Sequence, residues 1–235
     1  MSKDQFPLSR EFKNGFFYLA PGITYTVPFS EGSFSNQILD TTYTHNSIPQ
    51  FGSISYAFEA GWYHSFENPR FFHYLDAGVA YRKFRGSSEF ERIKEWESNR
   101  FSQVAGSDYA LDHISAVLRI IRSQQLGKFT FLTFGPGINF DYHLSDERSN
   151  APFVDGVVDG KYKAQLHLQL GIGIRLTERL IFQPQLELPL VDVVPQDGLQ
   201  PAHQYIDGKH YPLLLSFRFM FLRKDLMNCN APRLN

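Results

Sequence analysis

Histidine and serine side chains are the groups in this sequence whose types could support nucleophilic catalysis. His113 and Ser115 stand two positions apart, a spacing that puts both on one face of an extended strand. A serine nucleophile needs a base within hydrogen-bond distance and a third group that orients the base. No carboxylate follows at a suitable spacing, so we expect this pair to fill space rather than to form a lipid-deacylating centre. His64 and Ser65 are sequence neighbours and would face opposite sides of a strand.

Metal and cofactor chemistry finds little support. Cys229 is the single cysteine, which excludes an intramolecular disulfide and argues against cysteine-based zinc and iron–sulfur sites. Aspartates at 155, 159, 197 and 207 each precede a glycine, a pattern that could bind calcium but is more typical of turns. We expect no cofactor and no resident metal. Metal-ligand spacing is also absent among the remaining histidines, at positions 45, 73, 143, 167, 203 and 210.

One polar segment combines charges with large apolar side chains. Phe90, Ile93 and Trp96 lie among glutamates, arginine and lysine, and apolar anchors in an exposed segment are typical of partner-docking surfaces. Ser88 and Glu91 fit a helix capping box, which predicts one or two helical turns here. We treat Phe90, Ile93 and Trp96 as a candidate docking loop, with ordinary loop packing as the alternative.

The elements that must position these residues are β-strands. Between Ala164 and Leu176 every second residue is apolar, and Gln165, His167 and Arg175 are among the residues that alternate with them. A strict period of two predicts a strand, and its length suffices to cross a bilayer at a tilt. Looser alternation predicts seven more strands. The eight expected strands cover residues 16–29, 53–66, 71–84, 113–123, 129–143, 164–176, 180–194 and 211–222.

The connections alternate between long and short along the chain. Long extracellular loops and short periplasmic turns are typical of bacterial outer-membrane barrels, and tight-turn residues such as Asn68-Pro69 and Gly127 occur in the short connections. Both termini then lie on the periplasmic side. The long connections run to about residue 50 and over 86–108, 144–161 and 195–210; the short ones are 67–70, 124–128 and 177–179.

A barrel of eight strands closes every backbone hydrogen bond and leaves a lumen that side chains can fill. One parity of these strands carries charges and glycines. Charges enclosed there must pair, because an isolated buried charge costs far more than one interaction returns. We expect Glu59, Asp76 and Glu187 to bind Arg119 and Arg218. The full set of predicted lumen residues is Glu59, Asp76, Arg82, Arg119, Arg175, Glu187 and Arg218.

Composition agrees with a membrane barrel. The chain has 23 Lys plus Arg against 24 Asp plus Glu, so no overall positive charge attracts nucleic acid. The 23 Phe and 12 Tyr exceed what a small core needs and suit aromatic belts at both interfaces of a bilayer. The first residues lack the apolar stretch of a secretory signal. We therefore expect a mature chain whose signal peptide has been removed.

Segments such as Gly61-Trp62-Tyr63-His64-Ser65-Phe66 and Gly171-Ile172-Gly173-Ile174-Arg175, in this strand and loop order, resemble small outer-membrane barrels of the OmpA transmembrane-domain and OmpX type. The resemblance is architectural and implies an all-β, eight-stranded, up-and-down transmembrane barrel in the bacterial outer membrane. The tail departs from the pattern of many such barrels, which end on an aromatic residue, because Phe221 is followed here by residues 222–235; this departure suggests a Bacteroidota-type lineage. The resemblance implies three regions: a periplasmic segment 1–14, the barrel 15–224 and a periplasmic tail 225–235. It carries no binding site with it.

The leading functional hypothesis is a non-enzymatic structural or accessory subunit that lies in the lipid bilayer and docks protein partners through its loops or its outer wall. A filled lumen without catalytic geometry motivates it. One alternative is a lipid-modifying enzyme of the outer membrane. The other is a soluble calycin-like carrier, in which the apolar parity would face inward around an apolar ligand.

Overall fold

Ten antiparallel β-strands make up the computed structural model, which describes residues 14–28, 32–38, 41–66, 71–96, 99–149, 162–193 and 210–223. No helix within these ranges is long and apolar enough to cross a membrane. The strands are β1 (Gly15–Pro28), β2 (Gly32–Ile38), β3 (Thr41–Ser53), β4 (Ser55–Ser65), β5 (Tyr74–Trp96), β6 (Asn99–Gln125), β7 (Thr130–Ser149), β8 (Tyr162–Thr177), β9 (Leu180–Asp192) and β10 (His210–Phe221).

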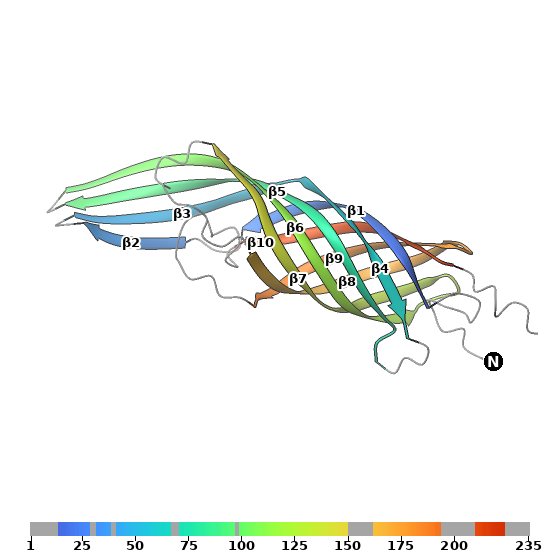
Figure 1. Cartoon of the computed structure of the whole chain (residues 1–235). Coiled ribbons are helices and arrows are strands. Elements are labelled where there is room, and N and C mark those ends of the chain that lie inside the picture. The colour runs from blue at the N-terminus through green and yellow to red at the C-terminus, as the bar shows by residue number, and fades with distance from the viewer. Residues whose placement is uncertain are drawn as a thin grey trace, which may run out of the picture.

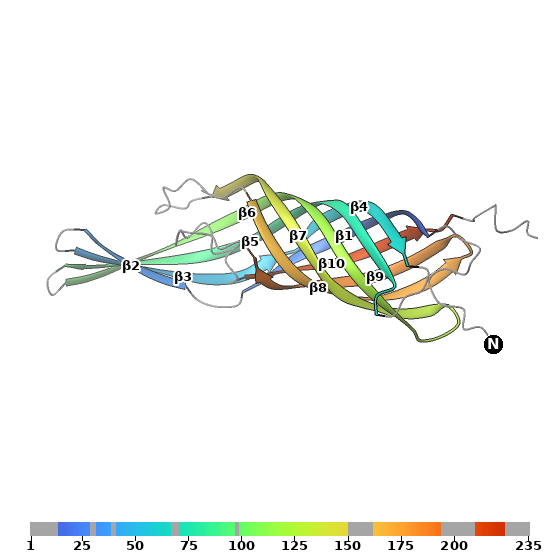
Figure 2. The same ribbon diagram turned by 60° about the horizontal axis from the view of Figure 1, so that its bottom comes forward.

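Eight of the strands close into a barrel (Figures 1 and 2). Around the ring they follow the order β1, β4, β5, β6, β7, β8, β9 and β10, and β10 pairs again with β1. Every one of the eight expected strands is present, so the predicted antiparallel barrel is confirmed. Closure leaves no open sheet edge along this ring, which is the condition for a sheet to cross hydrocarbon.

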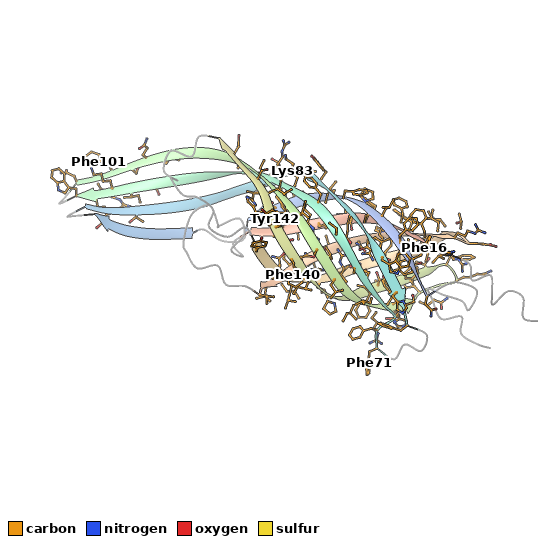
Figure 3. The ribbon with its side chains drawn as sticks, in the orientation of Figure 1. Phe16, Phe71, Lys83, Phe101, Phe140 and Tyr142 are labelled. Atoms are coloured by element: carbon orange, nitrogen blue, oxygen red, sulfur yellow. The ribbon has the colours of Figure 1, made fainter. Side chains whose placement is uncertain are left out.

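Side chains alternate between the outside and the inside of the barrel. Leu170 and Ile172 point outward with 38% and 46% of their surface exposed, whereas Arg119 and Glu187 point inward with 1% and 6% exposed. A soluble carrier needs the opposite arrangement, so that interpretation is wrong. Phe140 lies on the outer wall (Figure 3). Other large apolar side chains exposed on this wall include Phe17, Leu19, Ile23, Phe58, Trp62, Val79, Ile114, Leu118, Ile120, Leu166 and Ile174.

A twisted extension of the sheet projects from one end of the barrel where the sequence predicts long loops (Figure 2). We call it the outer sheet: β2, β3, residues 86–96 of β5 and residues 99–107 of β6, paired in the order β2, β3, β5, β6. Figure 1 shows it on the left, opposite the end of the barrel at which β4 ends. The expected helical turns at Ser88 and Glu91 are therefore wrong. A single helical turn is only marginally stable, whereas β5 is hydrogen-bonded here to β3 on one side and β6 on the other.

The lumen near the short turns is filled by apolar and aromatic side chains. Tyr63, Tyr74 and Ile121 are fully buried there, and Phe131 is 1% exposed. The sequence pattern does not reveal this core, because large residues are scattered along an otherwise polar and small parity. Its members are Tyr18, Ala20, Tyr63, Tyr74, Ile121, Phe131, Ile181, Met220 and Leu222.

The predicted terminal segments 1–14 and 225–235 lie outside the described residues, apart from Asn14. So do the aspartate and glycine positions 155–160, 197–198 and 207–208 and the single cysteine, Cys229. Residues 126–129 connect β6 with β7 where the sequence predicts the turn 124–128, and residues 178–179 connect β8 with β9 where it predicts 177–179. The expected turn 67–70 lies outside the described residues.

Candidate functional site: the charged lumen and the outer sheet

Arg119, on β6, lies at the centre of the charged lumen. Its guanidinium forms two hydrogen bonds with the Glu59 carboxylate, Nη1 to Oε1 at 2.6 Å and Nη2 to Oε2 at 2.7 Å. Nη2 also donates to Glu187 at 3.0 Å, and Nη1 lies 3.4 Å from Asp76. One planar cation thus joins three carboxylates from β4, β5 and β9, a geometry suited to the fork of donors that arginine offers.

Arg218, on β10, closes the network from the other side of the barrel. Its Nη1 donates to Asp76 Oδ2 at 2.5 Å, and its Nη2 lies 3.5 Å from Glu59 Oε1. The guanidinium carbon stands 4.0 Å from the centre of the Tyr18 ring, within cation–π distance. The Tyr18 hydroxyl in turn donates to Glu59 at 2.7 Å. The aromatic ring and the carboxylates therefore hold the same cation.

Arg82 forms the part of the network nearest the outer sheet. Its Nη1 and Nη2 donate to the two oxygens of Glu187 at 2.8 Å and 3.2 Å. Asn139 donates to the same carboxylate at 2.6 Å. His167, fully buried, receives the Arg119 Nε donor at 3.3 Å. Both oxygens of Glu187 thus accept more than one donor, as a buried carboxylate requires.

The structure brings six of the seven predicted lumen residues into one connected group, which we call the lumen network: Glu59, Asp76, Arg82, Arg119, Glu187 and Arg218. Three carboxylates balance three guanidiniums. Arg175 does not join them, which corrects that expectation. It lies near the end of β8, where its guanidinium donates to the backbone carbonyls of Thr177 and Glu178 in the adjacent turn, and the apolar core fills the lumen at that end.

Glycines leave the space that these side chains occupy. A Cβ on Gly61 or Gly78 would stand 2.5 Å from the Tyr18 hydroxyl, the group that binds Glu59. A Cβ on Gly137 would stand 2.3 Å from His167 Nε2 and 2.7 Å from Arg119 Cγ. The glycine-rich inward parity is therefore shaped around the lumen network.

The histidine and serine pair faces the lumen above this network. His113 is 9% exposed and its Nε2 lies 3.0 Å from Nδ1 of His143, while Ser115 is fully buried. The imidazole of His113 thus contacts a second histidine on the neighbouring strand β7. Within the part of the chain that the structure describes, no three His, Cys, Asp or Glu side chains gather to hold a metal ion.

The predicted docking residues lie on β5 in the outer sheet, and Ile93 and Trp96 do not share a face. Ile93 is 5% exposed, whereas Trp96, three residues further along, is 47% exposed and points to the opposite face. The side chain of Phe90 is outside the described part. Sequence reasoning missed Phe101 and Val104 on β6, which are 62% and 60% exposed. Figure 3 shows Phe101 at the far end of the outer sheet and Phe71 at the opposite end of the molecule.

Polar groups on the outer wall mark where the apolar wall gives way to the outer sheet. Asp112 accepts hydrogen bonds from the Tyr81 hydroxyl at 2.7 Å and from Ser145 at 2.8 Å, and Lys83 Nζ lies 3.4 Å from it. The hydrogen bonds and the ion pair among these groups satisfy their polar atoms at the surface. Lys83 stands at the base of the outer sheet in Figure 3.

These features define the class of protein. A closed barrel with paired charges inside, an apolar outer wall, and short turns at one end is a transmembrane β-barrel of the bacterial outer-membrane type. The chain is thus an eight-stranded outer-membrane barrel whose wall faces lipid.

Comparisons with known proteins find similar shapes among solved structures at low sequence identity. OprG, an outer membrane protein from Pseudomonas aeruginosa, is 10% identical, with 90% of this chain and 95% of that chain covered and a TM-score of 0.40. Ail, the attachment invasion locus protein of Yersinia pestis, is 8% identical, with 89% and 99% covered and a TM-score of 0.37 in its complex with the heparin analogue sucrose octasulfate. No protein-family model matches the chain, and no curated protein matches its sequence.

Proposed function

We propose that this protein is a non-enzymatic structural or accessory subunit of an outer-membrane assembly, and that it docks a protein partner through the outer sheet. The observation that carries the proposal is the outer sheet itself. Among the described residues, its two edge strands, β2 and residues 99–107 of β6, each pair on one side only. An open strand edge offers unpaired backbone donors and acceptors to another chain.

The exposed face of the outer sheet supports a protein partner. Lys94 pairs with Phe101, and Trp96 pairs with Asn99, so Lys94, Trp96 and Phe101 share one face. Tryptophan and phenylalanine are enriched at the centres of protein interfaces. The lumen supports a non-catalytic role, because its charged groups bind one another and its other half is an apolar core.

The test is capture of partners from native membranes in mild detergent, with the tagged full chain. We expect Trp96→Ser with Phe101→Ser to release a partner that the unchanged chain retains. The matched control is Phe129→Ser, which removes an exposed aromatic side chain at the opposite end of the barrel and should leave capture intact. Purification of the unchanged chain alone, without a stoichiometric partner, contradicts the proposal.

The lipid-modifying alternative has its own assay. Purified protein is incubated with lipid A and with phospholipid, and the products are resolved by mass spectrometry. Hydrolase or acyltransferase activity that disappears in His113→Ala would establish an enzyme and overturn the non-enzymatic role.

A further inference from the structure

The short-turn end of the barrel carries an excess of cations along half of its rim. In the described residues at this end, Arg122 lies near the end of β6 and Lys128 in the connection of β6 with β7; Arg175 lies near the end of β8 and Arg179 in the connection of β8 with β9; Arg223 follows β10. Strands β6 to β10 are consecutive neighbours in the ring. The exposed carboxylate described along this half-rim is Glu178. Five cations thus face one carboxylate.

Arg122 lies on the lipid-facing wall rather than in a turn. It continues the outward row of β6 that contains Leu118 and Ile120, which are 42% and 38% exposed. Its strand partner is Phe134 on β7. An arginine at the lower margin of an apolar wall buries its aliphatic stem and carries its guanidinium to the headgroup level.

Aromatic rings hold two of these cations at that level. The Arg122 guanidinium carbon lies 5.9 Å from the centre of the Phe134 ring, and Lys128 Nζ lies 5.2 Å from the centre of the Phe129 ring. Phe129 is 52% exposed beside the turn, where aromatic belts meet the membrane interface. A cation held beside such a ring therefore lies at the level of the lipid headgroups.

We propose that the half-rim formed by Arg122, Lys128, Arg179 and Arg223 binds the phosphate groups of anionic phospholipids in the periplasmic leaflet. The orientation follows from the short turns, which face the periplasm in barrels of this class. Each basic residue near the membrane surface raises the affinity for an anionic lipid by about fivefold. The site is independent of the outer sheet, which lies at the other end of the molecule (Figure 1).

The experiment is native mass spectrometry of the full chain in detergent with equimolar phosphatidylglycerol and phosphatidylcholine of identical acyl chains. We expect the unchanged protein to retain at least about fivefold more phosphatidylglycerol than phosphatidylcholine. Arg122→Gln with Lys128→Gln should clearly lower this preference, because it removes two of the four cations of the half-rim. The charge-preserving exchange Arg122→Lys with Lys128→Arg should keep the preference.

The control removes the same charge elsewhere. Lys94→Gln with Arg100→Gln changes two exposed cations of the outer sheet and should leave the lipid preference unchanged. Equal loss in both double variants would show a bulk charge effect and contradict the site. Equal retention of both lipids by the unchanged chain would also overturn it, and would favour an acidic protein as the occupant of the rim. Heat-modifiable migration in a denaturing gel checks that each variant is folded.

Discussion

Arg119 is the residue that holds the largest number of carboxylates in the lumen. It is buried together with Glu59, Asp76 and Glu187. Three guanidiniums and three carboxylates cancel in charge, but each cation serves more than one anion. Loss of one cation therefore leaves an uncompensated negative charge in a site from which water is excluded.

Replacement of Arg119 by methionine tests this arrangement. We expect Arg119→Met to lower the free energy of unfolding by about 3–5 kcal/mol, because buried carboxylates lose their shared donor. The change in the free energy of unfolding is measured by titration with urea in detergent, with heat-modifiable migration in a gel as the readout of the folded fraction. Arg122→Gln, three residues along the same strand but outward-facing, is the control and should change the free energy of unfolding by less than about 0.5 kcal/mol. Equal effects of the two substitutions would contradict a structural role for the lumen network.

Gly173 illustrates how a missing side chain shapes the apolar core. A Cβ at this position would stand 1.7 Å from Cζ of Phe131, a ring that is 1% exposed among other core residues. We expect Gly173→Ala to cost about 1–3 kcal/mol by overpacking. In a Phe131→Leu background the added cost of Gly173→Ala should fall clearly, since the clashing ring is gone. Simple additivity in a double-mutant cycle would contradict the contact.

The turn between β4 and β5 contains a titratable contact. His73 Nδ1 accepts a hydrogen bond from the backbone N–H of Ser123 at 3.1 Å. Partial burial, followed by the nearby charge of Arg122, holds the pKa of His73 below its usual value of 6.5. The neutral imidazole is thus the form that the fold favours, and protonation of Nδ1 removes the acceptor.

The expected result is a loss of stability in acid. A pKa that is lower in the folded than in the unfolded chain contributes stability above pH 6.5, and this contribution is lost as the pH falls below that value. Unfolding midpoints in urea at pH 7.5 and pH 5.5 measure it. His73→Asn keeps an acceptor but does not titrate, so its difference between the two pH values should be smaller. His64→Asn, at an exposed histidine of β4, should behave like the unchanged chain.

The strands of the barrel were predictable because the bilayer imposes a strict period of two on them. Leu168, Leu170 and Ile172 alternate with polar or small residues, and the charged partners of the lumen network share the other parity. Arg175 was assigned wrongly, because parity says on which side a residue lies but not at what height. The outer sheet was missed for a related reason. Away from lipid and core, neither face of β5 from Gly86 to Trp96 must be apolar, so its strand has no hydrophobic alternation to reveal it.

At the scale of the whole molecule, the barrel and the outer sheet differ in what stabilises them. The lumen network and the apolar core lie within the barrel, while the outer sheet adds backbone pairing beyond it. Replacement of residues 88–107 by Asn-Gly joins Ser87 to Asp108, which already pair across the hairpin, through a two-residue turn. We expect this variant to fold and to migrate heat-modifiably. It should also lose partner capture. Failure of the barrel to fold would show that the outer sheet is required for its assembly.

Strands β5 and β6 run without interruption between the short-turn end of the barrel and the outer sheet, over 23 and 27 residues. At about 3.3 Å per residue such a strand spans roughly 75 Å or more, well beyond the hydrocarbon of a bilayer, which is about 30 Å thick. A pull on the tip is therefore transmitted along the strands. It loads their many hydrogen bonds in shear, all at once, instead of peeling them apart in succession. A partner bound at the tip of the outer sheet would thus be connected to the membrane through mechanically stiff strands.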